Sequence, residues 1–243
     1  MTTLTVTNEQ QRAAKLGGIA TLLAIAIVVF GNYVLLTPLI IPGKAAETAQ
    51  NIVAHETAFR LAVICFLSYS LISLVLVSAF YVVLKPVNHG LALAAALCRL
   101  VFAVLWLMGS LEMLGALRLL SHAAYLQVFE TDRLQVLARA TIAATFDDYY
   151  VGLPFFSLAL TICAYLWLKS NFVPRWLSWF GIVSSAWCVI CAFIYLLVPA
   201  FAKPVDPYWF DSPMALFELI LSFWLLFKGL KPSAVAPTPN VER

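Results

Sequence analysis

The sequence Thr145-Phe-Asp-Asp-Tyr-Tyr-Val-Gly-Leu-Pro-Phe-Phe156 places two adjacent carboxylates, Asp147 and Asp148, at the edge of an apolar run. The run continues to Leu168, and its length of about 20 residues is what a helix needs to cross a hydrocarbon core of about 30 Å. We therefore predict a transmembrane helix over Tyr149–Leu168, and the rest of the chain can be interpreted as a membrane bundle around it.

The composition extends this interpretation to the whole chain. Of its 243 residues, 63% are hydrophobic and 11% are charged, whereas soluble domains average about 45–50% and about 25%. The chain is long enough for one membrane domain and too short for a second, soluble one. The net charge of +3 is small, and without a basic run or a stacking motif no nucleic-acid partner is predicted. The lipid bilayer is the expected partner.

Five further apolar runs are long enough to cross a bilayer. The predicted fold class is an all-α membrane protein, a bundle of six transmembrane helices with short surface helices in the first and third loops, Lys44–Glu56 and Arg118–Arg139. Ser212 is expected to cap the sixth helix, with Pro213 at its first position. The six predicted spans are Leu16–Ile41, Phe59–Leu84, Leu91–Leu117, Tyr149–Leu168, Trp176–Val198 and Pro213–Leu230.

The chain divides into three parts on this prediction. Residues 1–15 form a polar N-terminal segment, frayed over Met1–Gln11; residues 16–230 form the six-span transmembrane domain; residues 231–243 form a disordered, proline-rich tail. Six spans place both termini on one side of the membrane. The loops after the second and fourth spans are short and basic, so we expect the termini to be cytoplasmic.

Charged residues inside spans are rare and usually functional. Arg99 lies about 14 Å into the third span, where it could snorkel, bind a phosphate headgroup or pair with a carboxylate. Its own helix offers no partner, because Glu112 lies about 140° round the helix. The small neighbours of Glu112, which include Gly109 and Gly115, indicate that Glu112 faces protein and could make an interhelical hydrogen bond.

The remaining candidates lie in the fourth and sixth spans. Asp147 and Asp148 could simply begin the fourth helix as caps, or they could form a ligand site with Tyr150 where Pro154 breaks the first turn. Glu218 is too deep to be a cap and could hydrogen-bond a neighbouring helix. Four carboxylates toward the outer face could hold a cation or a metal, or pass protons, although they need not converge. The predicted ligand-binding residues are Arg99, Glu112, Asp147, Asp148, Tyr150 and Glu218.

No catalytic residue, metal site or cofactor is predicted. The chain has no Ser-His-Asp pattern, phosphate loop or HExxH motif, and no histidine lies deep in a span, where a pair could hold a haem. Cys188-x-x-Cys191 lies mid-span without a cationic neighbour, so its thiols are interpreted as packing groups.

The order of several short motifs resembles a bacterial membrane family, domain of unknown function 4386, over Arg12–Lys231. Lys44 departs from the pattern, since an acidic residue is expected after Pro-Gly. The resemblance implies a six-span protein of the bacterial plasma membrane and no activity, and it adds weight to Arg99 and Glu218, which fall on matching positions. The motifs are Pro42-Gly43, Thr48-Ala49, Asn51-Ile52, Tyr81, Leu84-Lys85-Pro86-Val87-Asn88, Arg99-Leu100, Gly152-Leu153-Pro154-Phe155-Phe156, Lys169-Ser170, Pro174-Arg175, Glu218-Leu219, Trp224-Leu225-Leu226 and Lys228-Gly229.

Three hypotheses for function follow. The intramembrane charges favour a protein that binds or transports a small molecule, an ion or a lipid. The small-residue helix faces and the lack of a catalytic signature fit an accessory or structural subunit, and a homo-oligomer is compatible with this. The clustered carboxylates would also suit an integral-membrane enzyme at the outer leaflet, so whether the protein is an enzyme stays open.

Overall fold

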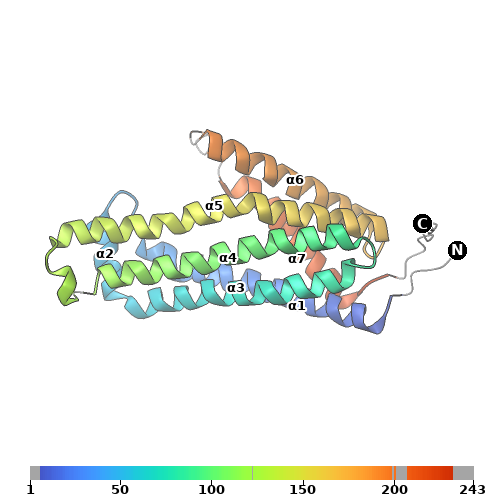
Figure 1. The fold of residues 1–243 in the computed structure, drawn as a ribbon, viewed down its shortest axis with the longest axis horizontal. Helices are drawn as coiled ribbons and strands as arrows, with labels where there is room; N and C mark the ends of the chain where they lie inside the picture. The colour runs from blue at the N-terminus through green and yellow to red at the C-terminus, as the bar shows by residue number, and fades with distance from the viewer. Residues whose placement is uncertain (1–5, 122, 199, 201–206, 232–243) are drawn as a thin grey trace, which may run out of the picture. The chain divides into compact units, whose positions relative to one another are not determined.

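The computed structural model describes residues 6–121, 123–198, 200 and 207–231, and these residues form helices joined by short turns (Figure 1). No strand occurs in this part of the chain. In order, the helices are α1 (Asn8–Val29), the π-helix Phe30–Leu36, the 3-10 helix Thr37–Leu39, α2 (Ala45–Ala54), α3 (Glu56–Leu84), α4 (His89–Leu119), the 3-10 helix Ala124–Leu126, α5 (Thr131–Ser170), α6 (Arg175–Leu197) and α7 (Pro207–Phe227).

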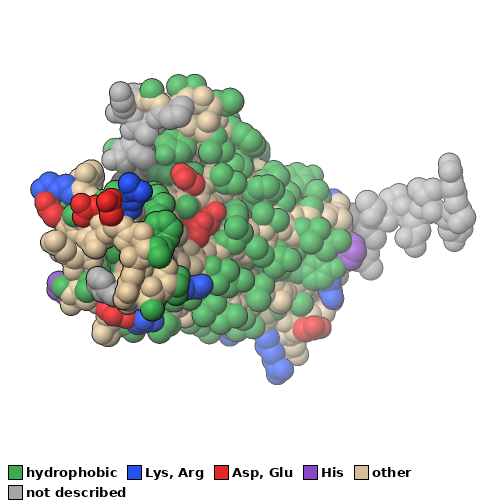
Figure 2. Space-filling view, turned by 60° about the vertical axis from the view of Figure 1, so that its left-hand side comes forward, with side chains coloured by type: hydrophobic (Ala, Val, Ile, Leu, Met, Phe, Trp, Pro, Cys, Tyr) green, Lys and Arg blue, Asp and Glu red, His purple; other side chains and the backbone are tan. Residues whose placement is uncertain are grey.

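Six helical segments of the described chain are long and apolar enough to cross a membrane, which confirms the predicted fold class. The short helices in the first and third loops are α2 and Ala124–Leu126. Figure 2 shows hydrophobic side chains over most of the visible face, with charged side chains in small groups. Leu111 and Val183 are 58% and 64% exposed, and such broad apolar exposure is the surface that a lipid-embedded helix presents.

The first predicted helix begins earlier than the sequence suggested. Thr7 and Gln10 form a capping box: the Gln10 N–H donates to Thr7 Oγ1 (3.1 Å), and the Thr7 N–H donates to Gln10 Oε1 (3.0 Å). This reciprocal pair satisfies two backbone donors that a helix start otherwise leaves open. The prediction that Met1–Gln11 is frayed is therefore wrong for residues 8–11, which are helical.

The fourth predicted span also begins earlier. The later part of the predicted surface helix Arg118–Arg139 and the predicted span from Tyr149 are one 40-residue helix, α5, which continues from Thr131 through Pro154 to Ser170. Ala138, Ile142 and Thr145 are buried at helical spacing, so the apolar stripe of α5 extends well before Asp147. The charged residues at the start of α5 do not interrupt it, because Asp132 and Arg133 are exposed, and the buried Thr145 donates its hydroxyl to the Ile142 carbonyl of its own helix.

The last predicted helix begins at Pro207 rather than Pro213, so Ser212 and Pro213 lie inside α7 and Ser212 is not its cap. A proline fits the first helical position because it lacks the N–H that would stay unpaired there. The predicted disordered tail, residues 231–243, lies outside the described residues beyond Lys231.

The helices pack as two compact units, each described here by itself. The first unit takes the described residues of 1–22, 75–100 and 153–243, and the second takes Leu23–Leu74 and Val101–Gly152. In the second unit, rings of α3, α4 and α5 form an aromatic core: Trp106 lies 4.7 Å from Phe66, 4.4 Å from Tyr69 and 6.2 Å from Tyr149 between ring centroids.

In the first unit, the start of α1 is fastened to segments far along the chain. Gln10 Nε2 donates to the Val83 carbonyl near the end of α3 (3.2 Å). Gln11 Oε1 accepts from the Leu230 N–H (3.0 Å), directly after the turn at Gly229, whose φ is +65°. The Lys231 N–H donates to the Phe172 carbonyl between α5 and α6 (2.9 Å). These bonds connect the ends of α1, α3, α5 and α7.

Helix α6 packs against α7 at close range, and Gly181 makes this approach possible. A Cβ at Gly181 would lie 2.5 Å from Cζ of the buried Phe217 ring. Small residues at such contacts let two membrane helices come close together.

Replacing Gly181 with alanine should therefore lower the thermal stability of the protein in detergent, by about 1–3 kcal/mol, because the added methyl overlaps a ring that is fixed by packing. Gly109→Ala is the matched control, since a Cβ there meets no atom closer than 3.6 Å. Equal unfolding midpoints for the two variants would contradict the close α6–α7 contact.

Candidate functional site

A buried ion pair joins α4 to α7 within the first unit. Arg99 Nη1 donates to Glu218 Oε1 at 2.9 Å, and each residue is 7% exposed. The Arg99 Cζ also lies 4.3 Å from the centre of the Phe156 ring on α5. The guanidinium thus contacts a carboxylate and an aromatic face from two other helices, both of which favour a cation in a dry environment.

The local sequence places Glu218 beside the buried stripe of α7. Phe210, Met214, Phe217 and Leu221 are buried at spacings of four, three and four residues, which defines one inward face of the helix. Glu218 directly follows Phe217 on this face, and Ser222 one turn later donates its hydroxyl to the Glu218 carbonyl (2.6 Å). The carboxylate therefore points into the helix bundle of this unit rather than toward lipid.

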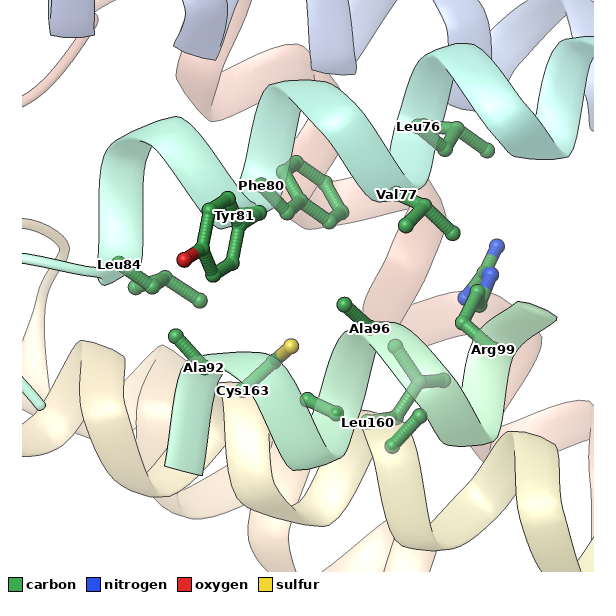
Figure 3. A pocket seen from close by; sticks show the side chains of 12 residues that line it. Leu76, Val77, Phe80, Tyr81, Leu84, Ala92, Ala96, Arg99, Leu160 and Cys163 are labelled. Atoms are coloured by element: carbon green, nitrogen blue, oxygen red, sulfur yellow. The ribbon is translucent and has the colours of Figure 1, made fainter. Parts of the chain in front are cut away.

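A small cavity adjoins Arg99 between α3, α4 and α5 of the first unit (Figure 3). Its volume is about 20 Å³, and one water needs roughly 10–15 Å³ measured in this way. Its walls are mostly apolar and include Leu160 and Ala92, with Arg99 at one end and Tyr81 toward the other. The space suits a water-sized occupant.

The other predicted residues gather in the second unit. Glu112 of α4 interacts electrostatically with Asp148 and Asp147 of α5. Asp147 is exposed, whereas Glu112 and Asp148 are half-buried. Glu112 Oε2 and Asp148 Oδ2 are buried and accept no hydrogen bond from any residue that the structure describes. Tyr150 packs edge-on against Tyr149, with ring centroids 5.5 Å apart.

The interpretation of Asp147 and Asp148 as helix caps is wrong. They lie 16 and 17 residues after the first residue of α5, Thr131, and the capping and dipole effects act only within the first turn. Pro154 does not create a broken first turn either, since α5 runs on through it. Both ideas failed because they assumed that α5 begins where its sequence becomes continuously apolar.

The predicted residues thus form one group within each unit, and the sequence left open whether the four carboxylates converge. Glu218 pairs with Arg99 in the first unit, and Glu112, Asp147 and Asp148 lie together in the second. Within the described part of the chain, no three His, Cys, Asp or Glu side chains are arranged to hold a metal ion. Sequence reasoning missed Phe156 and the cavity residue Cys163, because single apolar side chains in a span carry no signal of their own.

Comparisons with known proteins identify a family and no activity. A family model described as "Domain of unknown function (DUF4386)" matches residues 16–229. An "Uncharacterized protein" of Archaeoglobus fulgidus is 24% identical over 161 residues, which cover 66% of this chain and 79% of that protein. No solved structure matches the chain.

Replacing either residue of the ion pair alone should lower the stability of the protein. Arg99→Met or Glu218→Met alone leaves one buried charge without its partner, and we expect each to destabilise the protein by about 3–5 kcal/mol. The double variant, with methionine at both positions, should recover most of this loss, because apolar side chains of similar volume replace the pair. Thermal unfolding in detergent measures all three. Single variants as stable as the double variant would show that the two side chains are not coupled.

Proposed function

This chain belongs to the family of domain of unknown function 4386, and its described residues include six helices able to cross a membrane. We propose that it binds or transports a small molecule, an ion or a lipid at charged residues inside its spans. The observation that carries the proposal is the Arg99–Glu218 pair, which is more than nine-tenths buried. We also propose that the protein lies in the plasma membrane with both termini cytoplasmic, as its short basic loops favour.

The energetics of buried charge support a functional role. A buried ion pair is often no more stabilising than a well-packed apolar pair of the same volume. Stability alone therefore gives no reason to keep an arginine and a glutamate between α4 and α7. Ionisable side chains inside a membrane are rare and usually mark a functional site.

The second group of charges supports the same class of function. The carboxyl groups of Glu112 and Asp148 interact electrostatically. Each has a buried oxygen that accepts no hydrogen bond from a described residue. Carboxylate oxygens without donors suit a cation or a shared proton, either of which relieves their repulsion. Glu112, Asp147, Asp148 and Tyr150 are therefore proposed as ligand-binding residues alongside Arg99 and Glu218.

A role as an accessory or structural subunit is the second candidate. The close contact of Gly181 with Phe217 and the direct bond between Arg99 and Glu218 are both devices that fix α7 against its neighbours. In this alternative the ion pair fixes the register between the helices and binds no ligand. The main activity of the protein would then be self-association. An outer-leaflet enzyme has less support, because the described acids form no group able to hold a metal.

A charge swap separates the two leading candidates. The double variant Arg99→Glu/Glu218→Arg keeps an ion pair between α4 and α7 but moves the cation away from Phe156. If Arg99 binds a ligand, the swap should weaken retention or uptake at least tenfold, since a charged hydrogen bond contributes about 1.5–3 kcal/mol. Native mass spectrometry of gently purified protein measures retained molecules, and proteoliposomes measure uptake.

Glu130→Gln serves as the control, because Glu130 is a surface acid paired with Arg133 and its side chain is 76% exposed. It should leave retention and uptake unchanged. An occupant or uptake that is the same in the wild type, the swap and Glu112→Gln would contradict binding at the intramembrane charges. A wild-type protein that purifies as an empty oligomer would favour the accessory role.

A further inference from the structure

We propose that the cavity beside Arg99 is a water site, in which one water lies next to the buried Arg99–Glu218 pair. The inference rests on the proposed function in one respect: it identifies a water beside the pair that carries that function. The cavity lies wholly within the first unit, and α3, α4 and α5 each supply part of its wall.

The size of the cavity decides which occupant it takes. A volume of about 20 Å³ holds one water and is too small to enclose an acyl chain, a sugar or an amino acid. Small side chains on α4 leave this space: Ala92 and Ala96 lie one helical turn apart, with Ala92 across from Tyr81 and Ala96 between Tyr81 and Arg99 (Figure 3).

The chemistry at its inner end favours water over an empty void. Wholly apolar cavities of this size stay dry, whereas a water is retained where polar partners can hold it. Arg99 lines this cavity, and Cys163 of α5 adds a thiol nearby. A guanidinium forms charge-assisted hydrogen bonds, which are roughly twice as strong as neutral ones. In a bilayer core, a water bound to Arg99 lowers the cost of burying its charge.

The outer end of the cavity lies toward the turn between α3 and α4. Tyr81 and Leu84 belong to the last turn of α3, and Ala92 belongs to the first turn of α4. The turn between these helices carries the exposed Lys85, and the exposed His89 begins α4. The Tyr81 hydroxyl lies 2.9 Å from His89 Nε2. A lysine and a hydrogen-bonded tyrosine are typical of the membrane–water interface. Arg99 is ten residues further along α4, about 15 Å from this surface.

Hydroxyl-radical labelling by X-ray radiolysis tests the site, because radicals form from water at the place where the water is bound. Cys163 lines the cavity, whereas Cys188 on α6 is buried and does not line it. In the intact wild-type protein, mass spectrometry should show Cys163 oxidised at least several-fold faster than Cys188. Ala96→Val fills the cavity and should reduce the Cys163 rate to that of Cys188.

Ala94→Val is the matched control, since Ala94 is also half-buried on α4 but does not line the cavity. It should leave the Cys163 rate unchanged. Equal, slow oxidation of Cys163 and Cys188 in the wild type would overturn the proposal, as would fast Cys163 oxidation that Ala96→Val does not reduce. The measurement needs no ligand and no transport. A dry cavity would therefore refute the water site alone, while the retention and uptake experiments judge the proposed function independently.

Discussion

Lipid hydrocarbon offers no hydrogen-bond partner to a backbone amide, so a segment that crosses it must satisfy its amides internally. Over the residues that the structure describes, the consequence is six long helical segments, with apolar side chains on the faces that point away from the protein. The same constraint makes every polar side chain in a span conspicuous, because it must find a partner within the protein. The partners of Arg99 include Glu218 on α7 and Phe156 on α5.

The two groups of charged residues meet this constraint differently. Arg99 and Glu218 neutralise each other at hydrogen-bonding distance and lie against apolar helix faces. Glu112 and Asp148 carry charge of the same sign, and each has a buried oxygen without a donor among the described residues. The opposite charges of Arg99 and Glu218 cancel, whereas the two carboxyl groups of Glu112 and Asp148 need a proton or a cation to relieve their repulsion. For this reason the proposed function draws on both groups, and the ion pair alone would suit a structural role equally well.

The number of spans was predictable because about 20 consecutive apolar residues have one stable arrangement in a bilayer. The positions of the helix ends were less predictable. The buried stripe of α5 continues among polar residues through Ala138, Ile142 and Thr145. A prediction from hydropathy alone therefore placed the start of this helix too late. The partner of Arg99 was not predictable, since Glu218 is 119 residues away and helix order cannot be deduced from one sequence. The grouping of Glu112 with Asp148 depends in the same way on which helices are neighbours.

The bonds at the start of α1 have a consequence for biogenesis. Gln10 bonds a carbonyl 73 residues later, and Gln11 bonds an amide 219 residues later. The first helix can enter the bilayer early, and Gln10 can bond Val83 once α3 has followed, but Gln11 cannot complete its contact until Leu230, after the last helix, has left the ribosome. Because contacts between distant segments form late and slowly, closure of this end is expected to be among the last steps of folding. A chain that stops before Leu230 would keep the helices and lose this final step.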